Sequence, residues 1–450
     1  MPRAYAKTHN LRALLTLAAP IGVSQLAQTS MGFVDAVTVG RLGATELAGV
    51  ALGSTIFIPV VVVCLGVVLA VGPSVAQADG AGDRDAVARY ARQGLWLALL
   101  LTPLAAGATV FASRQLWRLG QDPAVAAIAG AYLRTVAWGC LPFLAFGALR
   151  SWLESVGRPL PVTAIAVSGV GVNVAANYGF VYGGFGLPEL GAVGAAYATV
   201  TSYVYLLAAI VTLALARTEF RSYGVLTRWR RPDGRVLAEL LRIGLPIGGS
   251  FGLETGLFTA ATILVGRFGA VALAAHQIAL QLASLAFMVP LSIALASTIR
   301  VGNCIGAGHP AVARHAGWLT IGLGGGSMAL SAAVFTLAPA PLIALFLGEG
   351  SGPDDGAVAA LATRLLFLAG AFQLVDGVQG AAAGALRGLK DTLGPMVIGA
   401  IGYWGVGLAG AWWLSGALGP EGVWWGLVAG LGVAAALLVG RWWRRSRHLS

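Results

Sequence analysis

Three acidic residues lie deep inside apolar segments of this 450-residue chain: Asp35 in "GFVDAV", Glu254 in "GLETGLF" and Asp376 in "FQLVDGVQG". The other acids fall in polar connections or near the ends of apolar segments. A carboxylate at the middle of a membrane costs about 3 kcal/mol on insertion scales, so such an acid is expected to have a function. A buried carboxylate can bind a cation or take up a proton. We therefore expect these three residues to bind or couple a cation.

Asp35 has candidate partners in two other apolar segments. Asn173 and Asn177 are four residues apart, so they share one face of a helix, and Thr199 lies in the next segment. A carboxylate with amide and hydroxyl oxygens suits a hard monovalent cation, or a carboxyl that is protonated reversibly. The alternative interpretation is that these polar groups only hydrogen-bond between helices.

Asp376 and a histidine mark two further polar positions. Gln373 and Gln379 lie three residues before and after Asp376, which predicts a polar stripe along one helix face. His276 and Gln277 open another apolar segment. A histidine there can relay protons, although a fixed hydrogen bond is the simpler interpretation. We treat these residues as candidate supporting or substrate contacts.

The bulk composition defines the elements that must position these residues. The chain is 57% hydrophobic and 10% charged, whereas soluble domains are about 25% charged. This indicates an integral membrane protein, with no metal site and no disulfide framework expected from three separated cysteines. A segment that crosses a membrane must satisfy its backbone internally, so helices are predicted. Twelve segments qualify: 13–39, 47–74, 94–113, 126–150, 161–184, 191–215, 240–266, 271–298, 316–339, 358–386, 394–415 and 422–440.

The distribution of basic residues predicts the orientation of the twelve segments. With the N-terminus in the cytoplasm, 23 of the 29 Lys and Arg residues fall on the cytoplasmic side, Arg387 among them, and four fall outside. This asymmetry follows the positive-inside rule. It predicts a multi-pass protein of the inner (cytoplasmic) membrane with both termini cytoplasmic. The net charge of +11 is then explained by basic residues that set the orientation in the membrane, and no nucleic-acid partner is expected. Most aromatic residues, including Tyr403, are interpreted as interfacial belts.

The two halves of the chain repeat each other. The stretch 19–44 aligns without gaps on 245–270, at an offset of 226 residues, and "GALR" occurs once in each half. The alignment places Asp35 opposite Ala261, so the acids break the symmetry of the repeat. Each half has six predicted spans, an even number, so an axis along the membrane normal should relate the halves.

The repeat predicts two lobes and places Gln28 opposite Glu254. A basic, polar stretch between the sixth and seventh spans is interpreted as a linker. The predicted organisation is an N-lobe at 1–216, a cytoplasmic linker at 217–239, a C-lobe at 240–441 and a cytoplasmic tail at 442–450.

At these residues the sequence resembles the multidrug and toxic compound extrusion (MATE) family, in particular its NorM-like branch. The resemblance covers nearly the whole chain, and its most specific stretches are "LAAPIGVSQLAQTSMGFVDAVTVGRLGATELAGVALG", "NVAANYGFVYGGFGLPELGAVGAAYAT", "GLPIGGSFGLETGLF", "LAAHQIALQ", "RVGNCIGAGHPAVAR" and "GALRGLKDT". The resemblance implies twelve helices in two six-helix lobes around a V-shaped cavity. It also implies export of lipophilic, often cationic, organic compounds in exchange for Na⁺ or H⁺.

The family's functional residues match the acids singled out above. Its acids in spans one, seven and ten correspond to Asp35, Glu254 and Asp376, and its N-lobe polar cluster corresponds to the two asparagines and the threonine. The family often has an aromatic residue shortly before the span-ten acid. Phe372 lies at that position here. Because phenylalanine has no hydroxyl group, it offers no oxygen to a cation there.

The resulting hypothesis is competition at shared carboxylates. Glu254 and Asp376 favour a cationic substrate when ionised, and Na⁺ or H⁺ neutralises them after the protein opens outward, so the substrate leaves. The NorM-like resemblance favours Na⁺ slightly. We expect a monomer surrounded by membrane lipids, acting on small-molecule drugs and organic cations, with no cofactor other than the coupling ion.

Three other classes of protein fit the sequence less well than a cation-coupled transporter. A flippase for lipid-linked precursors, the main alternative, would need a basic cavity, and only Arg134 and Arg364 lie near span interiors. An enzyme would need a convergent nucleophile or metal set, which the five scattered histidines do not supply. A channel would not explain two repeats with acids at different positions.

Overall fold

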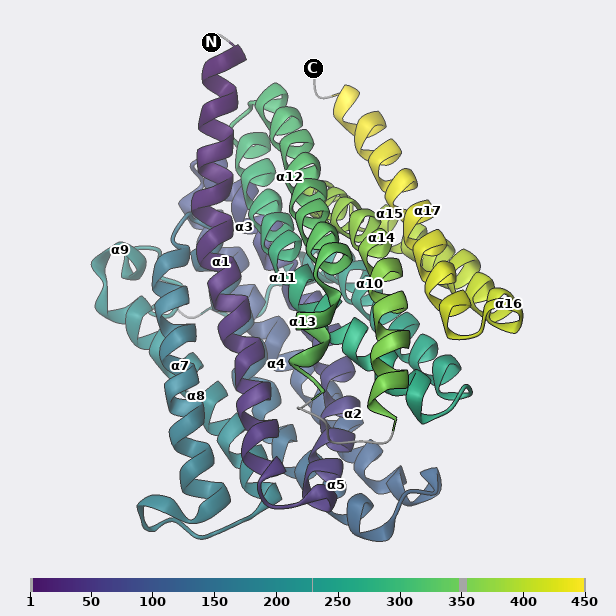
Figure 1. Cartoon of the computed structure of the whole chain (residues 1–450). Helices are drawn as coiled ribbons and strands as arrows, with labels where there is room; N and C mark the ends of the chain where they lie inside the picture. Colours follow the sequence, from purple (N-terminus) through teal and green to yellow (C-terminus); the bar gives the residue numbers. More distant parts are fainter. Residues whose placement is uncertain (1–2, 229, 348–353, 449–450) are drawn as a thin grey trace. The chain divides into compact units, whose positions relative to one another are not determined.

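Helices account for nearly all of the residues that this computed structural model describes, namely 3–228, 230–347 and 354–448 (Figure 1). No β-strand occurs in these ranges, so the predicted all-α fold is confirmed. The first half contains α1 (Arg3–Gly40), α2 (Ala44–Val68), α3 (Val71–Gly80), α4 (Arg84–Gln115), η1 (Leu116–Leu119), α5 (Pro123–Val136), η2 (Ala137–Gly139), α6 (Cys140–Ser155), α7 (Pro159–Tyr182), η3 (Gly184–Gly186), α8 (Ala192–Ala216) and α9 (Thr218–Arg221). The second half contains α10 (Gly234–Gly266), α11 (Ala270–Gly306), α12 (Pro310–Leu337), α13 (Pro339–Ala344), α14 (Asp355–Gly388), α15 (Leu393–Gly399), η4 (Ala400–Leu408), α16 (Ala409–Leu418) and α17 (Pro420–Arg447).

Two compact units divide the chain, and their borders fall inside α1 and α10 rather than in loops. The N-unit consists of residues 19–248, and the C-unit consists of residues 1–18 and 249–450. The borders lie beside Pro20 in α1 and Pro246 in α10, the two prolines that the internal repeat aligns. A proline inside a helix removes a backbone hydrogen bond and kinks the helix, so each of these helices has a natural break near the border.

Each unit has its own apolar core. In the N-unit, α7 packs along α8, α2 along α5 and α4 along α6, with Leu133, Leu144 and Trp152 fully buried. In the C-unit, α14 packs against α11, α12 and α17 (Figure 1), and Trp424 is buried. The helix that carries Asp376 is therefore enclosed by other helices of its own unit.

The helices extend past the predicted apolar segments at their polar ends. Among the described residues, eleven helical segments are long and apolar enough to cross a membrane. The remaining predicted span, 13–39, lies in α1, a continuous helix of 38 residues. Its apolar sequence is interrupted by the polar run "SQLAQTS". The third predicted span, 94–113, lies within α4, which begins at Arg84 because Asp83 caps it by accepting a hydrogen bond from the Ala86 backbone N–H. Hydropathy marks only the apolar part of such helices.

The segment between α9 and α10 is attached to the N-unit. The buried Arg92 side chain on α4 donates hydrogen bonds from Nη1 to the carbonyl oxygens of Gly224 at 3.0 Å and Arg228 at 3.3 Å. The predicted linker, 217–239, also includes the start of α10, which begins at Gly234. This segment is therefore a packed part of its unit rather than a free connection.

A π-helical stretch, η4, interrupts the eleventh predicted span between α15 and α16. A π-helix is rare and frequently marks a functional site, since its wider turn changes where side chains point. Tyr403 lies in this stretch and is buried, and Trp404 beside it donates a hydrogen bond from Nε1 to the Leu253 carbonyl oxygen at 3.0 Å. The irregular turn thus aims Tyr403 into the interior of the C-unit.

Replacing Gly377 by leucine should destabilise the protein by about 1–3 kcal/mol, because overpacking forces neighbouring atoms apart. A Cβ at Gly377 would lie 2.6 Å from the carbonyl oxygen of Gly324 on α12. Thermal unfolding of the detergent-purified chain measures the effect. Gly322→Leu on α12, the helix that Gly377 contacts, is the matched control, because a Cβ there meets no atom within 4 Å. Equal melting temperatures for the two variants would exclude the close α12–α14 contact.

Candidate functional site

A cluster centred on Asp35 forms inside the N-unit, from three helices. Asn173 and Asn177 on α7 donate hydrogen bonds from Nδ2 to Oδ1 of Asp35, at 3.1 and 2.6 Å. Thr199 on α8 donates from Oγ1 to Oδ2 of Asp35 at 2.7 Å. All four side chains are buried. The fold therefore brings together the four residues that the sequence analysis grouped.

The hydrogen bonds of this cluster suit either an ionised carboxylate or a carboxyl protonated on Oδ2, because both amides bond Oδ1 and the Thr199 hydroxyl also bonds the Ala195 carbonyl oxygen. An amide NH₂ group can only donate, so both asparagines need an acceptor at Asp35 in this arrangement. The Oδ1 atoms of Asn173 and Asn177 are buried, and neither has a hydrogen-bond partner. Those two oxygens, the carboxylate and the Thr199 hydroxyl are the hard ligands that a small cation prefers. Binding a cation or a proton at Asp35 would therefore change its contacts with α7 and α8.

A cavity of about 540 Å³ opens beside this cluster. Its volume lies within the range of about 300–1,000 Å³ that is typical of small-molecule sites. Gln28 lies on its wall and donates a hydrogen bond from Nε2 to the Ser24 carbonyl oxygen at 3.2 Å. Other polar or aromatic side chains on the wall are Gln25, Thr29, Asp35, Ser54, Phe57, Tyr132, Phe143, Arg150, Asn173, Thr199, Ser202 and Tyr203. Apolar and polar side chains share the wall, which suits a lipophilic molecule that also carries a polar or charged group.

The two other acids lie inside the C-unit, Glu254 on α10 and Asp376 on α14. Gln379 donates a hydrogen bond from Nε2 to Oδ1 of Asp376 at 3.2 Å, and its Oε1 accepts one from the Tyr403 hydroxyl at 2.8 Å. Asp376, Gln379 and Tyr403 are buried, whereas Glu254 is partly buried. The charges of the two acids act on each other, so the pair attracts positive charge.

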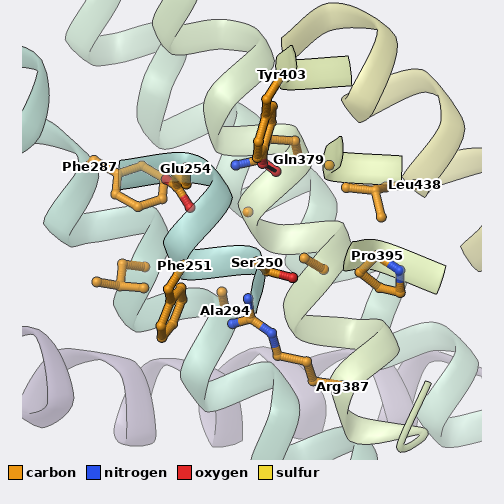
Figure 2. A pocket seen from close by; sticks show the side chains of 14 residues that line it. Ser250, Phe251, Glu254, Phe287, Ala294, Gln379, Arg387, Pro395, Tyr403 and Leu438 are labelled. Atoms are coloured by element: carbon orange, nitrogen blue, oxygen red, sulfur yellow. Dashed lines mark hydrogen bonds between the residues drawn. The ribbon is translucent and has the colours of Figure 1, made fainter. Parts of the chain in front are cut away.

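A second, much smaller cavity of about 40 Å³ lies against Glu254. Figure 2 shows Glu254, Gln379 and Tyr403 near one end of it and Arg387 with Ser250 and Phe251 near the other. A water molecule needs roughly 10–15 Å³ measured in this way. The cavity therefore has room for a small ion with a water molecule or two, but not for a drug-sized compound.

Phe372 and Gln373 on α14 are buried but lie on the wall of neither cavity. The Phe372 ring packs edge-on against Trp424, with ring centroids 5.9 Å apart. It is therefore part of an aromatic core contact. Neither amide atom of Gln373 has a hydrogen-bond partner, which leaves this polar side chain unsatisfied one turn from Asp376.

His276 lies in the apolar core of the C-unit, fully buried. Its Nε2 shares a hydrogen bond with the Thr262 hydroxyl at 3.1 Å, as the simpler interpretation of this residue predicts. Gln277 follows it on α11 and is partly buried. Neither side chain lines the two cavities described above, so neither is placed beside the acids.

Tyr403 and Arg387 are the site residues that sequence reasoning missed. Tyr403 was assigned to an interfacial belt, but it is buried and hydrogen-bonded beside the acids. Arg387 was counted among the cytoplasmic charges, but it lines the small cavity with Glu254. A signal for Arg387 existed in the repeated "GALR", because Arg150, its equivalent, lines the cavity of the N-unit.

Tyr403→Phe should lower gradient-driven substrate efflux severalfold while changing the unfolding free energy by only about 1 kcal/mol, the usual net value of one hydrogen bond. The phenyl ring stays, but Gln379 loses the hydroxyl that orients it toward Asp376. Dye efflux from membrane vesicles measures the effect. Tyr205→Phe, which removes an exposed hydroxyl bonded to Ser168, is the matched control. Equal efflux by the two variants would show that the Tyr403 hydroxyl does not position the site.

Long apolar helices in two units, with buried carboxylates beside cavities, define a polytopic membrane protein of the transporter class. The MatE family model matches residues 20–179 and 246–413. The two matched ranges begin at the two prolines that the internal repeat aligns. The chain therefore belongs to the MatE family, and the resemblance noted in the sequence is confirmed.

Curated relatives and solved structures agree with this assignment. The chain is 42% identical to the "Probable multidrug resistance protein NorM" of Burkholderia mallei (strain ATCC 23344), over 96% of this chain and 92% of that protein. It is 40% identical to the "Multidrug resistance protein NorM" of Burkholderia vietnamiensis, over 96% and 94%. The fold matches "Crystal structure of MATE in complex with MaL6" with a TM-score of 0.89 at 22% identity, covering 98% of this chain and 97% of that one. It also matches a eukaryotic MATE transporter with a TM-score of 0.87 at 20% identity, covering 99% of both chains.

Proposed function

We propose that the protein is a secondary active multidrug efflux antiporter. It exports lipophilic, often cationic, organic compounds in exchange for Na⁺ or H⁺ by alternating access. The observation that carries this proposal is the buried Asp35 carboxylate at the wall of a cavity of about 540 Å³. Family membership and the multidrug resistance proteins among the relatives support the same function.

The different sizes of the two cavities support a division of roles. The N-unit cavity is large enough for a drug-sized compound, and the C-unit cavity fits only a small ion with water. In our proposal the substrate occupies the N-unit cavity, while Glu254 and Asp376 hold the coupling cation. Direct competition for those two acids would require the small cavity to open first.

Neutralisation of Asp35 provides a release step for the substrate. Its two carboxylate oxygens accept three hydrogen bonds from α7 and α8. A bound proton or cation would weaken these contacts and so change the wall of the cavity. Such a step drives transport only if the ion prefers one conformation over the other. We propose that the neutral form of Asp35 favours the conformation that releases substrate.

The oligomeric state, the membrane and the orientation that the sequence predicts are part of the same proposal. We propose a monomer in the inner membrane with both termini in the cytoplasm, which carries out no covalent chemistry of its own. Transport of lipid-linked precursors is less well supported, because the one arginine on the described wall of the large cavity, Arg150, is paired with Glu154 at 2.7 Å. A pyrophosphate group would therefore find no unpaired cation on that wall.

Counterflow in proteoliposomes tests the proposed function. Purified protein is reconstituted in vesicles loaded with unlabelled tetraphenylphosphonium, and uptake of the labelled cation is followed. We expect saturable uptake that also responds to an imposed Na⁺ or H⁺ gradient. Uptake that is equally fast in protein-free vesicles, or that never saturates, would rule out a carrier for organic cations.

A further inference from the structure

Arg387 already makes one of the contacts that a bound organic cation would make in the small cavity. Its guanidinium lies over the Phe251 ring, 5.3 Å from the ring centroid. Glu254 lines the same cavity at its other end, so the two opposite charges act on each other across that space. Figure 2 shows the Arg387 side chain reaching the cavity beside Phe251 and Ser250, with Glu254 one turn further along α10. A carboxylate and an aromatic face are the two features that bind guanidinium and ammonium ions.

The internal repeat shows how Arg387 differs from its equivalent. In the N-unit, Arg150 of "GALR" donates a hydrogen bond from Nε to Oε1 of Glu154, one helical turn later, at 2.7 Å. In the C-unit, the acid one turn after Arg387 is Asp391. That acid accepts hydrogen bonds from Arg441 instead, at 2.8 and 2.9 Å. Arg387 is therefore left without the local acidic partner that its equivalent has.

The acid nearest in function to that partner is Glu254, which lies on another helix and lines the same cavity as Arg387. The repeat aligns Gln28 of the N-unit with Glu254 of the C-unit, and both residues line their cavities. Where the arginine is paired within its own helix, the α1 position is a neutral amide. Where the arginine lacks that pairing, the α10 position is an acid. The arginine and the acid of the C-unit therefore carry opposite charges on the wall of one cavity, without the direct ion pair that Arg150 makes.

The charge count of the C-unit site follows from this pairing. On the described wall of the small cavity Glu254 is the only acid and Arg387 the only basic residue. Asp376 adds a second negative charge through its hydrogen bond to Gln379 on that wall. The site is thus one positive charge short of neutrality when both acids are ionised. One monovalent cation, or one proton, would make it neutral.

We propose that Arg387 is a tethered counter-ion, which fills a cation subsite at Phe251, opposite Glu254 in the same cavity, and must be displaced when a cation enters. The subsite would accept a monovalent guanidinium or ammonium group in its place. This inference rests on the proposed function, because it identifies Arg387 as the group that competes with the transported or coupling cation. Arg387 is a specificity-determining residue in this account, since it limits the site to one added charge.

Binding of free guanidinium to Arg387→Ala tests the proposal. Equilibrium dialysis of the detergent-purified full chain with radiolabelled guanidinium should show saturable millimolar binding to this variant. The wild type should bind at least about tenfold more weakly, because its own guanidinium fills the subsite. Binding should also be lost in Arg387→Ala/Glu254→Gln. Equal binding by the wild type and Arg387→Ala would overturn the proposal.

A second variant keeps the proposal testable if Arg387→Ala does not fold. Arg387→Met preserves side-chain volume, and it should bind radiolabelled methylammonium, which is small enough for this cavity, about tenfold more tightly than the wild type, since one competing positive charge is gone. Arg364→Met is the matched control, because it removes an exposed arginine paired with Glu421. Unchanged or weaker affinity in folded Arg387→Met would refute the tethered counter-ion. Counterflow by the wild type tests the proposed antiport function separately. If the wild type shows counterflow and Glu254→Gln shows the same counterflow, the antiport function stands and the role assigned to Glu254 is wrong.

Discussion

Glu254→Gln is expected to abolish gradient-driven efflux of a dye such as ethidium, with a loss of at least about tenfold. The substitution keeps the shape of the side chain but removes the charge that attracts a cation to the small cavity. It also leaves the half-buried Arg387 without an opposite charge on the wall of its cavity. Efflux from energised membrane vesicles, normalised to the amount of folded protein, measures the effect.

Asp376→Asn should give a similar loss, because Asp376 is hydrogen-bonded to Gln379, which lines the same small cavity as Glu254. Thr259→Val on α10 is the matched control, since the Thr259 hydroxyl bonds only within its own helix, to the Thr255 carbonyl oxygen. Normal efflux by folded Glu254→Gln and Asp376→Asn would remove the C-unit acids from the mechanism.

Asp35→Asn is expected to keep substrate binding and to lose exchange by at least about tenfold. Asparagine still offers an acceptor to Thr199 or to the amides of α7, and its own NH₂ group can bond the unpartnered Oδ1 atoms of Asn173 and Asn177. The cavity should therefore keep its shape. The variant nevertheless cannot alternate between a charged and a neutral side chain, so the proposed release step is lost.

Two measurements on the same preparation distinguish these effects of Asp35→Asn. Tetraphenylphosphonium affinity is measured in detergent, and counterflow is measured in proteoliposomes. Thr38→Val is the control, because this residue lies one turn along α1 and its hydroxyl bonds only to the Val34 carbonyl oxygen. Persistent counterflow would exclude Asp35 as the trigger, and loss of affinity together with counterflow would make it a substrate ligand.

The cluster around Asp35 could be predicted from the sequence because its residues are rare there. An acid inside an apolar segment is costly, and Asn173 and Asn177 are one helical turn apart. The stripe of Asp376 and Gln379 on α14 follows from the same reasoning. Their roles in coupling stay predictions, since geometry alone does not identify the ion.

The other half of the C-unit site could not be predicted, because it depends on packing between distant helices. Tyr403 resembles any aromatic residue near a span end, and only the π-helical turn of η4 aims it at Gln379. Arg387 lies at the end of α14, where basic residues are usually interpreted as topological signals. Its role depends on Asp391 being bonded to Arg441, which no local pattern shows.

The difference in cavity size also changes the hypothesis of competition at shared carboxylates. The sequence analysis placed substrate and coupling ion at the same two acids. A cavity of about 40 Å³ beside Glu254 and one of about 540 Å³ beside Asp35 favour separate sites in the two units. Coupling would then depend on conformations that differ in affinity for both ligands.

Ethidium efflux from proteoliposomes under separately imposed gradients tests the central claim most directly. Vesicles hold wild-type protein and dye, and either an inwardly directed Na⁺ gradient or an inwardly directed H⁺ gradient is applied at constant membrane potential. We predict that one of the two gradients accelerates efflux from the wild type, and that Glu254→Gln removes the acceleration. Efflux that is the same with either gradient and with none would contradict cation-coupled antiport.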